Sequence, residues 1–271
     1  MTKPQPAGVS SHGPSILDVS DPWQMNLGER AAIVGLLADL RPSLSIEIGT
    51  AEGGSLRQIS RFSEQAHSFD LVEPQLDVAE LGNVALHTGD SHVLLPELLR
   101  VLAEGGENVD FVLVDGDHSA EGVARDMRDL LDSDAVGRTA IVMHDTLNPE
   151  VRRGLEAVNY DLWPKVVYVD LDWVAGCVYR APIEGEMWAG VGLVVCDAER
   201  PRSPGTSASQ QRYHPHFPIM RRGLEVDGEL AALRADLERC QAANRAIQSS
   251  ASWRLTAPLR RAKAAVAQRI A

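Results

Sequence analysis

The sequence predicts an α/β protein with a doubly wound, mostly parallel sheet and a C-terminal helical extension. Short apolar runs alternate with segments of helical period between residues 28 and 197. Such alternation predicts parallel strands joined by right-handed helical crossovers. The chain has 271 residues and is 44% hydrophobic, which suffices for one α/β domain with further segments beside it.

Each element follows from its local pattern. The first helix has apolar residues at helical spacing and ends before Pro42. Apolar runs predict strands at 44–49, 68–74, 84–90, 109–116 and 139–145, and closing strands of the same sheet at 165–171, 175–181 and 191–197. Helical patterns occupy 28–40, 54–63, 75–81, 92–105, 120–133 and 149–160.

The composition divides the chain into four parts. Residues 1–20 are polar and read as a mobile N-terminal arm, residues 21–200 form the α/β domain, and the Pro-rich residues 201–222 are expected to be a linker. Residues 223–271 are expected to form a coiled-coil-like helix and a basic amphipathic tail.

The C-terminal part leaves two pairs of alternatives open. Positions 230, 233, 237, 240, 244 and 247 follow the 3,4 spacing of a coiled coil, which predicts a homo-oligomer, whereas a lone helix packed on the main domain fits equally well. The tail from residue 251 carries five basic residues and no acid. It suits an anionic membrane surface or a partner protein, or else it covers the protein's own core.

Charge and cysteine content restrict the class of protein. The net charge of −12 argues against a general nucleic-acid binder. Three scattered cysteines give neither a disulfide framework nor a zinc site and suit a reducing cytoplasm. No signal peptide or membrane span is visible, so we expect a cytoplasmic protein, with the tail as a means of association with the inner membrane face.

A Gly-rich turn after the first strand suggests a nucleoside site. Its pattern is Glu47-x-Gly49-x-x-x-Gly53-x-Ser55, which differs from the dinucleotide fingerprint. Glycines let the backbone approach a ligand closely, and an acid before the turn suits a positively charged cofactor. Glu73 ends the second strand where a carboxylate can hold ribose hydroxyls, and Asp90 follows the third, where it can accept from an adenine amino group. Helix capping or solvent exposure is the alternative for these acids.

Two later strands also end in polar residues. "VDGDH" at 114–118 and "HDT" at 144–146 each place carboxylates and imidazoles after an apolar run. Together with "EIGTAEGGS", "VEP" and "GDS", these motifs resemble the class I S-adenosylmethionine-dependent methyltransferases, over roughly residues 25–195. They are most similar to the metal-dependent O-methyltransferases that include catechol, caffeoyl-CoA and macrolide-sugar enzymes.

The resemblance implies a seven-stranded sheet and S-adenosylmethionine as cofactor. Cofactor-binding residues carried over from the motifs are Glu47, Gly49, Thr50, Gly53, Ser55, Glu73, Asp90, Ser91 and Asp115.

The resemblance also implies a divalent cation, with Asp115 and the pair His144 and Asp145 as ligands. Relatives have Asp-Asn or Glu-Asp at the pair, so His144 departs from their pattern. Mg²⁺ is expected first and Mn²⁺ second, although an imidazole ligand also admits Fe²⁺ or Zn²⁺. His144 touching the substrate is the alternative.

Macrolide-sugar enzymes carry Asp-x-x-His at the fourth strand, with that histidine as base. Asp115 and His118 have this spacing, so His118 is the candidate general base, and Asp117 either orients it or acts as a base itself. Capping of the following helix is the alternative for His118, although Ser119 suits that role better.

The expected reaction is O-methylation of a sugar hydroxyl on a cell-surface glycan or a glycosylated natural product. The C-terminal segment resembles extensions of bacterial glycosyltransferases and glycan enzymes, which favours a sugar acceptor. Alternatives are a catechol-type small-molecule O-methyltransferase, a noncatalytic scaffold of a glycan-assembly complex, and a metal-dependent hydroxylase or hydrolase, whose usual His-rich motifs are missing.

Overall fold

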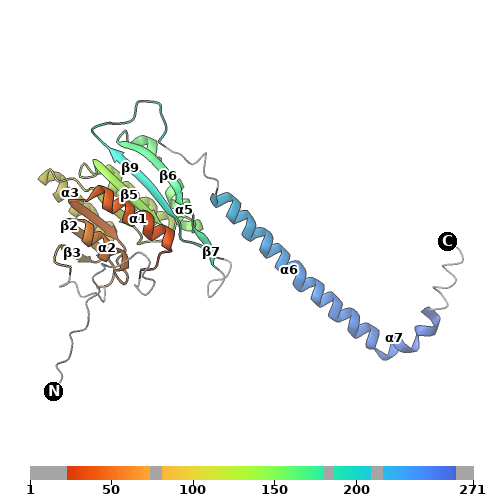
Figure 1. Cartoon of the computed structure of the whole chain (residues 1–271). Coiled ribbons are helices and arrows are strands. Elements are labelled where there is room, and N and C mark those ends of the chain that lie inside the picture. The colour runs from red at the N-terminus through yellow and green to blue at the C-terminus, as the bar shows by residue number, and fades with distance from the viewer. Residues whose placement is uncertain (1–22, 74–80, 180–185, 209–215, 261–271) are drawn as a thin grey trace, which may run out of the picture. The chain divides into compact units, whose positions relative to one another are not determined.

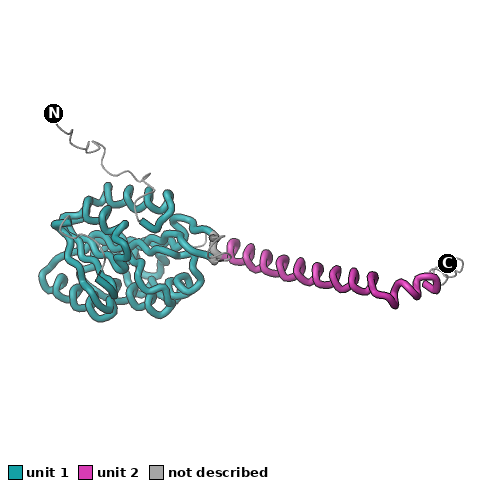
Figure 2. Tube along the Cα trace, turned by 90° about the horizontal axis from the view of Figure 1, so that it is seen from below, with its two compact units in different colours: residues 1–217 teal, residues 218–271 magenta. Residues whose placement is uncertain are grey.

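The structure is a computed structural model that describes residues 23–73, 81–179, 186–208 and 216–260. It divides into two units, residues 1–217 and 218–271 (Figure 2). The expected N-terminal arm (1–20), nearly all of the helix expected at 75–81 and the tail beyond residue 260 lie outside the described residues.

The first unit is built on a seven-stranded sheet with strand order β3-β2-β1-β4-β5-β9-β6 (Figure 1). The first five of its strands in chain order run parallel, and β9 is antiparallel to both β5 and β6. This confirms the predicted mostly parallel, doubly wound sheet. The strands are β1 (Leu44–Ile48), β2 (Gln65–Asp70), β3 (Val84–Thr88), β4 (Phe111–Val114), β5 (Arg138–His144), β6 (Val166–Val174) and β9 (Val191–Asp197).

Helices cover both faces of the sheet because its central strands are apolar on both sides. In β4, Phe111 and Leu113 join the apolar cluster that includes the first helix, whereas Val112 and Val114 join the cluster of the later helices. The helices are α1 (Leu27–Leu40), α2 (Gly54–Phe62), α3 (Ser91–Gly105), α4 (Ala120–Asp132) and α5 (Pro149–Glu156), with a 3₁₀ turn at Tyr160–Leu162.

Strand register brings the polar strand ends together. Ile48 of β1 pairs with Phe69 of β2 and with Val114 of β4, and Val114 in turn pairs with Met143 of β5. The next residue of each strand therefore lies at the same edge of the sheet. This edge receives Gly49, Asp70, Asp115 and His144.

The segment expected as a sheet strand at 175–181 takes a different place. Cys177–Tyr179 forms β7, which pairs with β8 (Glu186–Trp188) in a separate two-stranded sheet. The prediction of one continuous sheet was wrong here, because β9 inserts between β5 and β6 and leaves this short apolar run outside the ladder.

The second unit is helical. Helix α6 (His216–Ser249) begins within the expected linker, and α7 (Ala251–Leu255) follows it. The other end of the expected linker packs on the first unit, where the carbonyl of Ala208 accepts a hydrogen bond from Val169. In the part of the chain that the structure describes, no helix combines the length and the apolar character needed to cross a membrane.

Candidate active site

Two adjoining pockets open at the carboxyl edge of the sheet. The β4–β5 pocket has a volume of about 610 Å³ and is walled on one side by residues 23–26. The β2–β3 pocket has a volume of about 690 Å³ and lies over the ends of β1 to β4. Both pockets are lined by Gly49, Ala51, Asp115 and His118. Ligands in the two pockets would therefore meet at these four residues.

The turn after β1 is held close to the end of β4. Gly49 has φ +94°, and a Cβ there would lie 2.1 Å from the carbonyl oxygen of Asp115. Only glycine fits such a close approach in this backbone conformation. Asp70, at the end of β2, accepts hydrogen bonds from the amides of Thr50 (3.0 Å) and Ala51 (2.9 Å). Gly53 precedes α2 in the left-handed region, so the turn leads directly into this helix.

Glu47 lies behind this turn. Its carboxyl group is completely buried and accepts hydrogen bonds from Ser55 Oγ (2.5 Å) and Ser68 Oγ (2.6 Å). Burial raises the pKa of Glu47 to about 8, although the two serine hydroxyls oppose this shift. Glu47 is not among the residues that line the two pockets, whereas Ser55 and Thr50 line the β4–β5 pocket. The structure thus places Glu47 as a support of the turn.

The acids after β2 and β3 lie in different settings. Glu73 is exposed and follows the end of β2 by three residues, and it is not one of the residues lining the β2–β3 pocket. Asp90 and Ser91 do line that pocket. Asp90 also caps α3, because its Oδ1 accepts a hydrogen bond from the amide of His92 at 2.9 Å.

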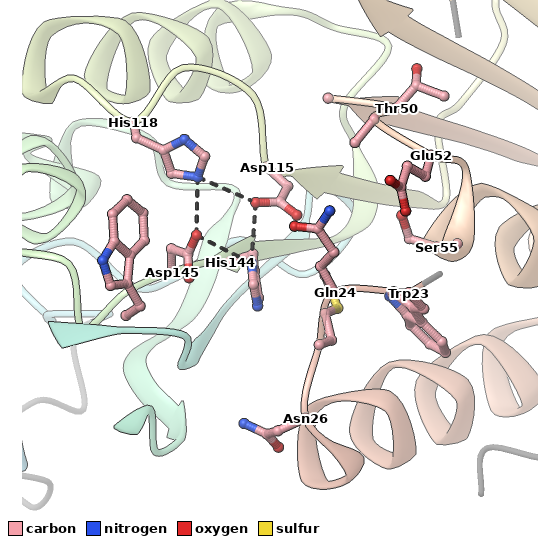
Figure 3. Close-up of a pocket in the computed structure, with 15 residues that line it drawn as sticks. Trp23, Gln24, Asn26, Thr50, Glu52, Ser55, Asp115, His118, His144 and Asp145 are labelled. Carbon is pink, nitrogen blue, oxygen red and sulfur yellow. Dashed lines mark hydrogen bonds and ion pairs between the residues drawn. The ribbon is translucent and has the colours of Figure 1, made fainter. Parts of the chain in front are cut away.

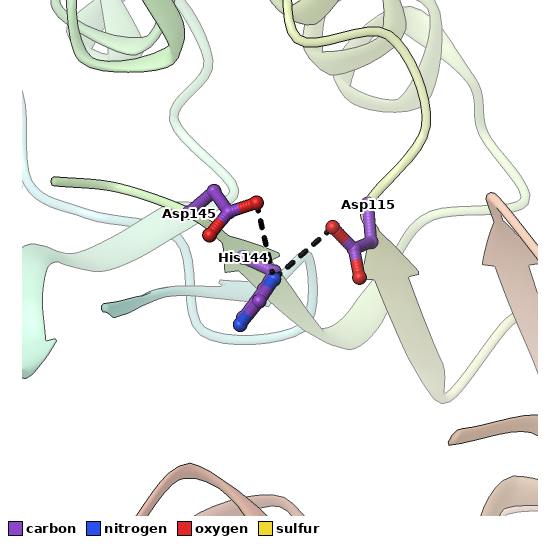
Figure 4. Close-up of side chains that lie close together, drawn as sticks. All are labelled: Asp115, His144 and Asp145. Carbon is purple, nitrogen blue, oxygen red and sulfur yellow. Dashed lines mark hydrogen bonds and ion pairs between the residues drawn. The ribbon is translucent and has the colours of Figure 1, made fainter. Parts of the chain in front are cut away.

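Asp115, His144 and Asp145 form a compact cluster at the ends of β4 and β5 (Figure 4). One ligand atom from each lies within 4.8 Å of the others. Nδ1 of His144 is 3.1 Å from Asp115 Oδ1 and 3.6 Å from Asp145 Oδ2. Burial opposes ionisation of Asp115, yet His144 and His118 hold its pKa below the usual value. Burial also opposes ionisation of His144, which for an imidazole means a lower pKa. The acidic neighbours of His144, Asp115 first among them, outweigh this effect and raise its pKa above the usual value.

The backbone at this cluster is strained. Asp145 has φ +54°, in the left-handed region that non-glycine residues rarely occupy. Its Oδ1 accepts a hydrogen bond of 2.6 Å from the amide of Ala189, a residue that also has positive φ. Strain of this kind persists when the surrounding structure fixes it, and it occurs often at functional sites.

His118 faces the same cluster from the loop after β4 (Figure 3). Its Nε2 lies 3.0 Å from Asp145 Oδ2 and 3.6 Å from Asp115 Oδ1. Contacts with Asp115 and Asp145 raise the pKa of His118 to about 9. The ring also meets the Trp188 ring edge to face, with centroids 5.6 Å apart. The imidazole is therefore positioned by two carboxylates and one indole.

Asp117 does not have the predicted orienting role. Its Oδ1 accepts a hydrogen bond from the amide of Ser119 (2.7 Å), and its other oxygen lies over Gly122 in the first turn of α4. Asp115 and Asp145 orient His118 instead. Ser119 caps α4 through Gly122, as the sequence suggested.

Residues 46–146, from β1 to just beyond Asp145, match the family model described as a methyltransferase domain. Over these residues the chain is similar to a methyltransferase domain. The seven-stranded, mostly parallel sheet is the one that the resemblance to class I methyltransferases predicted.

Several solved structures are similar to this chain. An O-methyltransferase from Bacillus cereus in complex with SAH is 16% identical, with 65% of this chain and 84% of that chain covered and a TM-score of 0.48. The O-methyltransferase TomG from Streptomyces achromogenes, involved in tomaymycin synthesis, is 16% identical, with 64% and 81% covered and a TM-score of 0.46. The MycE methyltransferase of the mycinamycin pathway, in complex with Mg and SAH, is 17% identical, with 65% and 50% covered and a TM-score of 0.43. The comparison with curated protein sequences gave no match.

The cluster of Asp115, His144 and Asp145 fits a divalent cation by its donor set. Two carboxylates and one imidazole converge, and the imidazole turns Nδ1 toward both acids. Oxygen donors suit Mg²⁺, and the nitrogen donor extends the range to Mn²⁺ and softer ions. Asp115, His144 and Asp145 are thus the residues that would hold a metal.

Two acids of the site were missed from the sequence. Glu29 of α1 is completely buried, and its Oε2 lies 3.5 Å from Nε2 of His144. A signal existed, because Asn26-x-x-Glu29 is a capping box. Asp70, which fixes the glycine turn, had a weaker signal as the last residue of β2.

Proposed function

We propose that the protein is an S-adenosylmethionine-dependent, divalent-metal-assisted O-methyltransferase that acts on a sugar hydroxyl. The acceptor would belong to a cell-surface glycan or a glycosylated natural product. The observation that carries this proposal is the position of His118, whose imidazole faces Asp115 and Asp145 at the boundary shared by the two pockets.

The β2–β3 pocket is the side that suits the cofactor. Its lining combines the glycine turn after β1 with polar groups at the start of α3, namely Asp90 and Ser91. A nucleoside offers hydroxyl and amino groups that such residues can bind. S-adenosylmethionine held there would supply the methyl group.

The β4–β5 pocket is the acceptor side. Gln24, Asn26 and Glu52 contribute polar side chains to its lining, and Trp23 contributes an aromatic one (Figure 3). Trp188 adds a second indole to the lining. Amide and carboxylate groups suit an acceptor with several hydroxyls, and indole rings offer apolar surface for its ring face.

Proton removal is the task of His118. A hydroxyl is a poor nucleophile until its proton leaves, and a positioned imidazole can accept that proton. A divalent cation at Asp115, His144 and Asp145 would lower the pKa of the acceptor hydroxyl and offset the carboxylate charge that keeps His118 protonated. Asp115 and Asp145 then keep the imidazole aimed at the junction of the pockets.

The test is isothermal titration of S-adenosylhomocysteine into the full chain, with Mg²⁺ and after EDTA, followed by a methyl-transfer screen. Binding in both conditions with transfer to sugar acceptors only when metal is present is the expected result. Transfer only to catechols would replace the sugar acceptor by a small phenolic one. The absence of binding in both conditions would overturn the enzyme assignment in favour of a scaffold.

A further inference from the structure

Helix α6 carries an uncovered apolar stripe. Val226, Leu230, Leu233, Leu237 and Ile247 are between 42% and 64% exposed. Together with positions 240 and 244 they recur in alternating steps of three and four residues, the heptad spacing of a coiled coil. A helix this long gains most of its stability in water from packing such a stripe against another surface.

We propose that this stripe pairs with the same stripe of a second copy of the chain, as a parallel, in-register two-stranded coiled coil. The heptad assignment is fixed by the spacing. Positions 230, 237 and 244 are a positions, and positions 226, 233, 240 and 247 are d positions. Gly223 occupies the preceding a position and separates exposed Ile219, at the preceding d position, from the continuous seam, which begins at Val226.

The polar residue in the seam supports a parallel dimer. Asn244 is the one asparagine at an a position, and in a parallel dimer it faces the same residue of the second copy. A buried Asn pair of this kind fixes register and oligomeric state. β-branched residues at d favour larger assemblies, but here they stand only at the two ends, Val226 and Ile247, with Leu233 and Cys240 between them.

The charges beside the seam are complementary in the same arrangement. In a parallel dimer each g residue faces the following e residue of the other copy. This places Arg222 opposite Asp227 and Glu229 opposite Arg234, both pairs of opposite charge.

The antiparallel register that sets Leu237 against Cys240 lacks such pairs. In this register Arg234 faces Gln241 and Asp236 faces Ala243, so Arg234 loses the acidic partner that the parallel dimer gives it, whereas Asp236 faces a neutral residue in both arrangements. This register would also place Leu233 against Asn244. The side chains of α6 therefore favour parallel pairing with the second copy.

The first test is the mass of the full chain by size exclusion with light scattering. We expect twice the chain mass of 29.4 kDa. The Leu230→Asp/Leu237→Asp variant should return to the mass of one chain, because two buried charges break the seam. Ala235→Asp/Ala242→Asp, with both changes at exposed f positions, is the matched control and should remain dimeric. A single-chain mass for the unmodified protein, or a dimer that survives the double leucine change, would overturn the proposal.

Two further measurements test orientation. Cys240 lies at a d position and is exposed in the single chain, whereas Cys196 is buried. Diamide, which takes up the two electrons and two protons lost by a pair of thiols, should link two Cys240 side chains, and Cys240→Ser should abolish the linked dimer. Glu229→Arg should weaken the dimer, and adding Arg234→Glu should restore it. A dimer that resists Cys240 linkage, or that ignores both charge reversals, would exclude the parallel register.

A remaining outcome is a monomer that binds vesicles containing anionic lipid. That result would overturn the dimer and assign the stripe to a membrane surface.

Discussion

Oε2 of Glu29 lies 3.5 Å from Nε2 of His144, on the side of the imidazole opposite to Asp115. The same carboxylate accepts hydrogen bonds from the amides of Asn26 (2.8 Å) and Gly190 (2.6 Å). Glu29 thus joins the start of α1 to the end of β5 and to the loop before β9. A carboxylate behind a histidine fixes the orientation of the ring, so Glu29 positions Nδ1 of His144 toward the candidate metal.

Replacing Glu29 by Gln should weaken metal binding. Gln retains one oxygen as the capping-box acceptor for Asn26, but it removes the charge behind His144 and the acceptor for the Gly190 amide. Loss of such a partner typically reduces metal affinity by about 10-fold to 100-fold. Titration of Mn²⁺ into the variant measures this, with the far-ultraviolet circular dichroism spectrum as a control for α1. An unchanged affinity would show that His144 does not bind the metal through Nδ1.

Replacing His118 by Ala should abolish methyl transfer and leave binding of S-adenosylhomocysteine intact. A general base typically contributes about 100-fold to 10,000-fold to the rate, and Asp115 with the glycine turn remains in the variant. Single-turnover transfer and calorimetric titration measure the two properties.

Asp117→Asn is the matched control for His118. The Asp117 side chain accepts from Ser119 at the start of α4, and Asn can accept the same hydrogen bond. We expect near-normal turnover. Strong loss of activity in Asp117→Asn, with activity retained in His118→Ala, would transfer the role of base to Asp117.

Glu47 should make stability depend on pH in the cofactor-free protein. Its folded pKa of about 8 lies above its ordinary value of 4.5, so the folded state holds a proton that the unfolded state releases. The contribution of Glu47 to stability is therefore complete below pH 4.5 and is lost as the pH rises from 4.5 to about 8.

The Glu47→Gln variant isolates this effect. Its free energy of unfolding relative to the unmodified protein should rise by up to about 1.4 kcal/mol per pH unit within this window. Urea unfolding of both proteins between about pH 5 and pH 8 measures the difference between their free energies of unfolding. The titration of all other groups contributes equally to both proteins and cancels in this difference. A difference independent of pH would mean that Glu47 is ionised in the fold.

Gly49→Ala should destabilise the turn and reduce cofactor binding. The added Cβ would meet the carbonyl of Asp115, in a backbone conformation unfavourable to alanine. A cost of about 1–3 kcal/mol or more is expected in urea unfolding. Gly35→Ala is the control, because its Cβ would meet nothing within 4 Å on the exposed side of α1, and it should stabilise the protein by about 0.5–1 kcal/mol. Equal effects of the two changes would contradict this role of Gly49.

The parallel core could be predicted because each of its buried strands is a continuous apolar run in the sequence. The runs before Gly49, Asp115 and Asp145 each end in polar residues, and parallel strands bring such ends to one edge. The segment at 175–181 could not be placed, because a short apolar run does not say whether it joins the sheet or a separate hairpin.

By itself, the sequence determined the doubly wound fold, the glycine turn and the grouping of Asp115, His118, His144 and Asp145. The apolar runs and the glycine motif are visible in short stretches of sequence, and parallel strands bring the polar residues that follow such runs to one edge of the sheet. Only the tertiary structure decided what each polar group contacts. It buried Glu47 behind the turn, turned Asp117 toward α4 and brought Glu29 behind His144. Burial and side-chain direction are set by residues distant along the chain, and the spacing of a motif does not contain that information.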